Sequence, residues 1–258
     1  MALLAPPPAA PPSPPPPVPR PELIAHRGTP REHPENSLPG FRQALAHGVD
    51  GIELDVHCTR DGVPVVHHDP ELAPNGSPVG GRSIAGLTRA ELARHALAPG
   101  VGVPTLAEVL DVVGERAVVY VEVKARAAER AVLTVLAERG ARAPVHSFDH
   151  RVARTVHVAS AATPVGVLST SYLLDPVHAM RAAGARDLWQ HWAMIDGALV
   201  ETVHAAGGRV IAWTVNDPDY AVALARLGVD GLCTDVPAEL AAALAPRRAA
   251  EPARASRA

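Results

Sequence analysis

Short apolar segments alternate along this chain with longer segments whose apolar residues have helical spacing. Eight of the short segments predict strands, and they lie at residues 22–26, 51–57, 118–124, 144–148, 164–169, 187–191, 209–215 and 231–234. Helical stretches such as SLPGFRQALAH and AAERAVLTVLAERG separate them. Strands and helices that alternate in this way are typical of a parallel sheet with crossover helices.

Glycine residues mark the ends of several predicted helices. They stand just before the next strand and are Gly48, Gly140, Gly184, Gly207 and Gly228. Glycine adopts the left-handed conformation that ends a helix without steric cost. Repeated units of this kind favour a (β/α)8 barrel over an open doubly wound sheet. The segment after the first strand, HRGTPREHPEN, also lacks the GxGxxG pattern of a dinucleotide-binding fold.

The connection after the second strand is longer than an ordinary loop between a strand and a helix. It runs from about residue 69 to 104 and contains the turn-rich stretch NGSPVGGRS. Within it, Thr88 and Glu91 have the spacing of a capping box and predict a short helix. We therefore expect a barrel with a short insertion, and long connections after barrel strands usually shape an active-site mouth.

Composition sets the limits of the folded domain. The chain has 258 residues, of which 47% are hydrophobic and 20% charged, enough for one large α/β domain. We assign residues 21–246 to it and expect a disordered proline-rich arm at 1–20 and a disordered tail at 247–258.

Charge, hydropathy and cysteine content limit the partners and the location of the protein. The formal net charge of −3 shows no excess of basic residues that would indicate nucleic-acid binding. No apolar run reaches the ~18 residues of a membrane-inserted helix. Cys58 and Cys233 are expected as free thiols, so we predict a cytoplasmic location.

Acidic residues lie on two of the predicted strands. Glu53 and Asp55 alternate along the second strand, and Glu122 lies near the end of the third. On a solvated strand face such residues need no partner. In a parallel barrel, however, both faces of a strand are covered, so three inward carboxylates repel one another unless a cation binds them. Their oxygen ligands suit Mg2+ or Ca2+, and we predict a metal site there.

Two histidines and two cations lie near neighbouring strand ends. His26 ends the first strand and His68 follows the second, so the pair suits general acid–base catalysis. Arg27 and Lys124 carry the positive charge that binds a phosphate group. Together with the carboxylates they indicate phosphoryl chemistry. His57 lies near the same strand end, and the sequence assigns it no role.

A series of segments, taken in order, resembles the glycerophosphodiester phosphodiesterase family. The segments are IAHRG, PENSLPGF, GIELDVHCTRDGVPVVHHDPEL, PTLAEVL, VYVEVK, SFD, AWTVN and GVDGLCTDVP. The resemblance extends from about residue 23 to about residue 240. It implies a TIM barrel that hydrolyses small glycerophosphodiesters to sn-glycerol 3-phosphate and an alcohol.

The resemblance also implies roles for individual residues. The catalytic acid–base pair would be His26 and His68, and the metal ligands would be Glu53, Asp55 and Glu122. Substrate contacts would come from Arg27, Glu35, Asn36, Lys124 and Trp213. The chain departs from the family in two places: Ser37 stands where threonine is frequent, and the connection at 70–104 is shorter than in many members. The second departure bears on how the alcohol part of the substrate is held.

Three other functions fit parts of the pattern. One is a phospholipase D-like barrel enzyme that acts on lysophospholipids, although the sequence has no obvious membrane-binding segment. Another is a non-catalytic binding protein, although both histidines and all three carboxylates are present. A third is a metal-dependent amidohydrolase, whose first strand normally has an HxH pair that IAHRG lacks. The sequence leaves open the alcohol group, the preferred metal and whether the chain forms a homo-oligomer.

Overall fold

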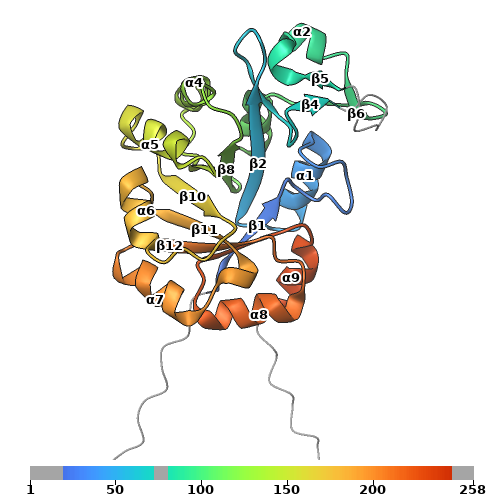
Figure 1. Cartoon of the computed structure of the whole chain (residues 1–258). Coiled ribbons are helices and arrows are strands. Elements are labelled where there is room, and N and C mark those ends of the chain that lie inside the picture. Colours follow the sequence, from blue (N-terminus) through green and yellow to red (C-terminus); the bar gives the residue numbers. More distant parts are fainter. Residues whose placement is uncertain (1–19, 73–80, 246–258) are drawn as a thin grey trace, which may run out of the picture.

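The computed structural model describes residues 20–72 and 81–245, which form a closed barrel of parallel strands surrounded by helices (Figure 1). In chain order the barrel strands are β1 (Glu22–His26), β2 (Gly51–Cys58), β8 (Val118–Val123), β9 (Val145–Ser147), β10 (Val165–Ser169), β11 (Asp187–His191), β12 (Arg209–Trp213) and β13 (Gly231–Thr234). Strand β1 pairs with both β2 and β13, which closes the sheet. The predicted (β/α)8 TIM barrel is confirmed.

The predicted strands agree with the observed strands to within two residues at each end. The largest difference is in the strand expected at 209–215, which ends at Trp213 because its pairing partner His191 is the last residue of β11. The proline-rich arm and the tail expected from the sequence lie outside the described residues, apart from Arg20. None of the helices within the two described ranges combines the length and apolar character that a membrane span requires.

Helices between the strands cover the outside of the barrel (Figure 1). They are α1 (Leu38–Ala46), α3 (Leu106–Val113), α4 (Glu129–Arg139), α5 (His150–Ala159), α6 (Pro176–Ala183), α7 (Gly197–Ala205), α8 (Pro218–Leu227) and α9 (Pro237–Leu244), with a 3-10 turn, η3 (Trp192–Met194), before α7. Four successive helices begin at an aspartate whose side chain accepts a backbone N–H, and these aspartates are Asp149, Asp175, Asp196 and Asp217. Such caps satisfy amides that have no partner within the helix. Helix starts are therefore encoded locally.

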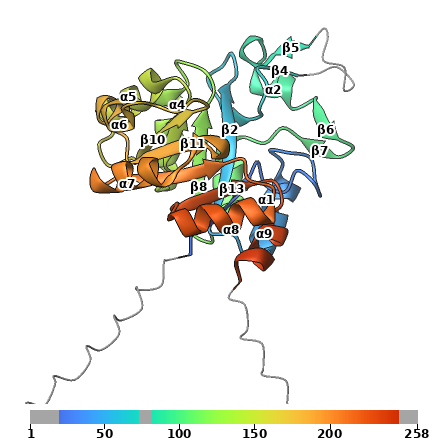
Figure 2. The ribbon, with the colours of Figure 1, turned by 60° about the horizontal axis from the view of Figure 1, so that its bottom comes forward.

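The insertion after β2 forms a small lobe at one side of the barrel (Figure 2). Strand β3 (Pro64–Val66) first turns back antiparallel to β2. The lobe then contains β4 (Glu71–Leu72), β5 (Arg82–Ser83), η2 (Ile84–Gly86), α2 (Arg89–Leu92), β6 (Ala96–Ala98) and β7 (Val101–Gly102). Thr88 and Glu91 form the predicted capping box at the start of α2. Leu72, Ile84 and Leu92 belong to the lobe's own apolar cluster, so it is a packed unit.

The middle of the barrel is filled by large side chains that occupy the space beside glycines. A Cβ atom on Gly51 would lie 2.8 Å from the ring of Tyr120, and one on Gly166 would lie 2.9 Å from the ring of Trp189. Tyr120 and Trp189 are buried and pack against each other edge to face, with ring centroids 5.3 Å apart. Glycine on one strand therefore permits an aromatic residue on the neighbouring strand.

Ion pairs fill the end of the barrel where the strands begin. Arg209 lies 2.9 Å from Glu22 and 3.8 Å from Asp187, and the hydroxyl of Tyr120 donates to Glu22 at 2.5 Å. Asp187 is fully buried, and Arg186 also binds it at 2.7 Å. This network and the aromatic layer above it separate the strand beginnings from the cavity at the strand ends.

Candidate active site

A cavity of about 240 Å3 lies at the carboxyl ends of the strands. Its lining residues are His26, Arg27, Glu53, His68, Glu122, Lys124, His146, Phe148, Leu168, Trp189, Trp213 and Cys233. Seven residues predicted from the sequence are among them. The other three predicted residues touch the lining: Glu35 and Asp55 bind the side chain of Arg27, and the backbone N–H of Asn36 donates to the backbone oxygen of Arg27. The fold therefore brings all ten predicted positions to one end of the barrel.

The three predicted metal ligands come from two neighbouring strands and are all buried. Glu53 and Asp55 alternate along β2, and Asp55 pairs in register with Glu122 on β8. Burial and then repulsion from Asp55 raise the pKa of both Glu53 and Glu122 above the usual value for glutamate. Ionisation of these two carboxyl groups is therefore unfavourable in the buried site, and a positive charge beside them would reduce its free-energy cost.

Asp55 differs from the two glutamates because it already has three polar partners. Its carboxylate lies 3.0 Å from Nε of Arg27 and 3.4 Å from Nζ of Lys124, and it accepts a hydrogen bond from the amide of Asn36 at 2.8 Å. Although burial opposes ionisation, Arg27 and Lys124 lower the pKa of Asp55 below its usual value. Asp55 is therefore ionised and holds both cations at the cavity. Lys124 also lies 3.0 Å from Glu122.

Arg27 and Asn36 adopt an unusual backbone conformation. Both have φ of 55°, in the left-handed region that residues other than glycine seldom occupy. The guanidinium group of Arg27 lies 3.0 Å from Glu35, so the arginine is held from two sides. Strain of this kind costs on the order of 1–3 kcal/mol per residue and persists where surrounding contacts fix the conformation. The contacts with Asp55 and Glu35 are such restraints.

His26 is held by an acidic residue that the sequence analysis assigned no role. Nδ1 of His26 lies 2.6 Å from Oδ1 of Asp235, which follows the last barrel strand, and Asn216 donates to the other oxygen at 2.7 Å. Burial lowers the pKa of His26, but the hydrogen bond with Asp235 and the charge of Glu53 outweigh it and raise the pKa above the usual value. The position of Asp235 directly after a barrel strand, within the segment CTDVP, was the available signal.

His68 and His57 are linked through the main chain. Nδ1 of His68 lies 2.8 Å from Oδ1 of Asp69, and Nε2 of His57 lies 3.0 Å from the backbone oxygen of His68. The residue without a predicted role, His57, therefore connects β2 to the segment that carries His68. His67 is directed elsewhere, since its Nδ1 lies 2.8 Å from the backbone oxygen of Asp69.

His146 on β9 is a lining residue that the sequence analysis missed. It pairs in register with Glu122, and its Nε2 lies 3.7 Å from Oε1 of Glu53. Burial lowers the pKa of His146 to about 4, so the ring is neutral at pH 7. The signal in the sequence was weak: in PVHSF, a spacing of two places His146 and Phe148 on one strand face.

Aromatic side chains form the remaining wall of the cavity. Trp213, at the end of β12, contacts Phe148 edge to face with ring centroids 5.3 Å apart. The Trp213–Thr214 peptide bond is cis. Phe148 is 44% exposed, so the wall extends to the surface of the molecule. A polar floor beside an apolar wall suits a substrate with a charged centre and carbon-bearing groups.

Comparison with protein families gives a match that spans most of the domain. The model of the "Glycerophosphoryl diester phosphodiesterase family" matches residues 26–239, from the first cavity histidine to the start of α9. The chain belongs to this family. It is accordingly an enzyme with the family's barrel fold.

Individual members of the family are similar over nearly their whole length. A glycerophosphodiester phosphodiesterase of Caldanaerobacter subterraneus is 30% identical over 233 residues, which cover 84% of this chain and 95% of that protein. Among solved structures, an Oleispira antarctica phosphodiesterase in complex with the product sn-glycerol-3-phosphate has a TM-score of 0.80 and 25% identity, covering 87% of this chain and 97% of that one. A glycerophosphodiester phosphodiesterase of Parabacteroides distasonis has a TM-score of 0.77 with the same identity and coverage.

The donor atoms at the mouth of this family member fit a divalent cation. Glu53, Glu122 and His146 each offer one atom, and these atoms lie within 4.8 Å of one another. Within the described residues, Oδ1 of Asp55 and both ring nitrogens of His146 are buried without a hydrogen-bond partner. Buried polar atoms of this kind normally have partners, and carboxylates with an imidazole are common ligands of divalent metals.

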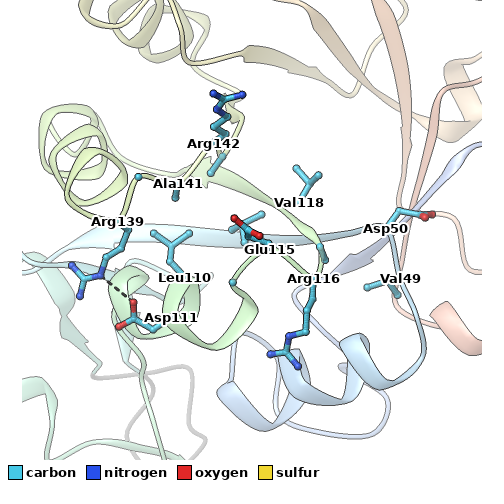
Figure 3. Close-up of a pocket in the computed structure, with 15 residues that line it drawn as sticks. Val49, Asp50, Leu110, Asp111, Glu115, Arg116, Val118, Arg139, Ala141 and Arg142 are labelled. Carbon is cyan, nitrogen blue, oxygen red and sulfur yellow. Dashed lines mark hydrogen bonds and ion pairs between the residues drawn. The ribbon is translucent and has the colours of Figure 1, made fainter.

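A second, larger hollow lies at the opposite end of the barrel and has a different character (Figure 3). Its volume is about 950 Å3, and it is lined by the segments that precede β2, β8 and β9, where Arg139 and Asp111 form an ion pair at 3.1 Å. None of its lining residues is a histidine. In barrels of this fold the chemistry takes place at the carboxyl ends of the strands, so we assign the active site to the smaller cavity.

Proposed function

We propose that this family member hydrolyses glycerophosphodiesters to sn-glycerol 3-phosphate and an alcohol, with His26 and His68 as the acid–base pair. The observation that carries the proposal is the shared cavity, which both histidines line together with buried carboxylates and two cations. The Oleispira antarctica relative, whose structure holds sn-glycerol-3-phosphate, supports the same substrate class.

The cations and the aromatic wall suit different parts of such a substrate. Arg27 and Lys124 supply the positive charge for the phosphate group, while Glu35 and Asn36 hold Arg27 and Asp55 in place. Trp213 offers an apolar face to the carbon atoms of the substrate. A divalent cation bound by Glu53, Asp55 and Glu122 would offset the negative charge of the phosphodiester. An oxygen-only ligand set would favour Mg2+ or Ca2+.

Each of the two histidines has one ring nitrogen, Nε2, that can exchange a proton with the substrate. Because Asp235 and Asp69 lie at the Nδ1 atoms, Nε2 of His26 and Nε2 of His68 are left for the substrate. One histidine accepts the proton of the nucleophile, and the other gives a proton to the departing alkoxide. We propose the substrate's own glycerol hydroxyl as nucleophile. Its attack on phosphorus releases the alcohol and forms a cyclic phosphate, which water then opens.

A coupled assay for glycerol 3-phosphate over several glycerophosphodiesters tests the proposal. We expect the His26→Ala and His68→Ala variants to lose about 100-fold or more in kcat, because general acid–base catalysis contributes at least this factor. His178→Ala, on the exposed surface of α6, serves as the control and retains activity. Near-normal turnover by either cavity variant, with its fold verified by circular dichroism, would contradict the assignment.

Removal of metal and a change of substrate separate the remaining alternatives. We expect activity to disappear in a chelator and to return when a divalent cation is added. Activity that survives complete removal of divalent cations would rule out the carboxylate metal site. Products from glycerophosphocholine and from lysophosphatidylcholine distinguish hydrolysis of small diesters from the phospholipase D-like alternative, in which lysophosphatidylcholine is the better substrate. The cytoplasmic location and a homo-oligomeric state stay predictions.

A further inference from the structure

An imidazole lies beside the predicted carboxylate site. Glu122 and His146 are paired residues on the neighbouring strands β8 and β9, so their side chains lie on the same face of the sheet, and both line the cavity. Nε2 of His146 lies 3.7 Å from Oε1 of Glu53. One donor atom from each of these three residues falls within 4.8 Å of the others, which is compatible with a single bound ion.

The surroundings of His146 fix its ring but leave its nitrogens without protein partners. The ring stacks on Trp189, with centroids 4.2 Å apart and planes within 5° of parallel. The residue is 1% exposed, and neither ring nitrogen has a hydrogen-bond partner among the described residues. His26 and His57, in contrast, each have a ring nitrogen within 3.0 Å of an oxygen atom. A buried imidazole that is held in a fixed orientation and has no protein partner for its nitrogens is suited to bind a metal.

The carboxylates around His146 are not equivalent as partners for a metal. Asp55 is held by Arg27, Lys124 and Asn36, whereas Glu53 and Glu122 face His146 directly. The group of donors closest to one another therefore contains one nitrogen and two carboxylates. Imidazole is a common ligand of first-row transition ions, whereas Ca2+ prefers oxygen ligands alone. Mn2+ takes carboxylate oxygens readily and can also accept a nitrogen ligand.

We propose that His146 is a nitrogen ligand of the active-site cation and raises the affinity of the site for Mn2+ relative to Ca2+. The proposal deepens the proposed function and rests on the cation site included there. Its physical basis is the position of a buried ring nitrogen, without a protein hydrogen-bond partner among the described residues, beside two buried carboxylates that otherwise offer only oxygen.

The test uses the full chain, freed of metal with a chelator and then loaded with Mn2+ alone. Pulsed electron paramagnetic resonance detects coupling between Mn2+ and a directly bound 14N nucleus. We expect this coupling in the wild type and in the His26→Gln and His178→Gln controls, and its loss in His146→Gln. Calorimetry should show Mn2+ binding weakened in His146→Gln by at least about tenfold. Loss of a residue that only hydrogen-bonds to a metal ligand already weakens metal binding by about this factor. Ca2+ binding should change less.

Absence of 14N coupling in the wild type would overturn the proposal, whether or not the His146→Gln variant folds. Persistence of the coupling in folded His146→Gln, or its loss in His26→Gln, would overturn it as well. If His146→Gln does not fold, coupling that is present in the wild type and retained in His26→Gln supports the proposal. Both measurements are made without substrate. A protein that shows the coupling but does not hydrolyse glycerophosphodiesters would therefore refute the proposed function and leave the ligand assignment intact.

Discussion

Each proposed acid–base histidine has one ring nitrogen beside an aspartate, but the two aspartates lie in different surroundings. The side chain of Asp235, the partner of His26, is 19% exposed, while that of Asp69, the partner of His68, is 69% exposed. Solvent screens a charge pair at an exposed position more strongly than at a buried one. The interaction between His26 and Asp235 is therefore the less screened of the two.

Replacement of Asp235 by asparagine tests this difference. Asp235 raises the pKa of His26, so we expect the pKa of the ring to fall in Asp235→Asn. The limb of the kcat/KM profile that reports His26 should then move to lower pH, whether His26 acts as acid or base. The pH profile and an NMR titration of the ring provide the measurement. In the control variant Asp69→Asn, whose altered residue contacts His68 and not His26, the limb that reports His26 should stay in place. An unchanged profile in Asp235→Asn would refute the coupling.

At the scale of elements, strand β2 and the segment after it carry much of the cavity. Glu53, Asp55 and His57 alternate along one face of β2. β3 then runs back along β2, and the chain reaches His68 two residues after β3 ends. The bond from Nε2 of His57 to the backbone oxygen of His68 joins the two segments at 3.0 Å. We infer that His57 positions His68 rather than contacting the substrate.

The effect of His57 on turnover can be separated from a general loss of stability. We expect His57→Ala to lower kcat by roughly tenfold with little change in KM, because His68 is less well oriented. His57→Gln has an amide that can donate to the same carbonyl and should recover part of kcat. If both variants have the same kcat, the hydrogen bond does not position His68, and steady-state kinetics on the two proteins decides between these outcomes.

At the scale of the whole molecule, the barrel is filled in layers that leave space only near the strand ends. Ion pairs around Arg209 fill the first layer, and Tyr120 and Trp189 fill the second. The buried carboxylates and His146 lie above them and line the cavity. The aromatic layer depends on the glycines beside it, since Gly51 and Gly166 leave the volume that the two rings occupy. Packing of the interior therefore sets the depth of the active site.

Substitution of Gly51 by alanine should reveal the cost of disturbing this layer. The added Cβ atom would lie 2.8 Å from the buried ring of Tyr120, and overpacking of this kind typically costs about 1–3 kcal/mol. The free energy of unfolding in urea is the measurement. Gly197→Ala, where no atom lies within 4 Å of the added carbon, is the matched control and should not lose stability. Equal stability of the two variants would argue against a tightly packed layer.

Agreement between sequence and structure depends on the separation of the interacting residues. Helix caps follow from neighbouring residues, and Thr88 with Glu91 is an example that local pattern alone predicted. The contact between His26 and Asp235 joins positions 209 residues apart. The sequence placed both residues at strand ends but gave no reason to pair them, because β1 and β13 become neighbours only when the barrel closes.

The sequence by itself determined the alternation of strands and helices, and hence which residues reach the carboxyl end of the barrel. It also determined that Glu53 and Asp55 share a strand face, because side chains alternate along a strand. Only the tertiary structure decided which side chains each of the buried carboxylates contacts. Asp55 binds Arg27 and Lys124, while Glu53 and Glu122 face His146. The physical reason is that pairing depends on the register of β2, β8 and β9 and on the direction of each buried side chain, which the order of residues along a single strand does not specify.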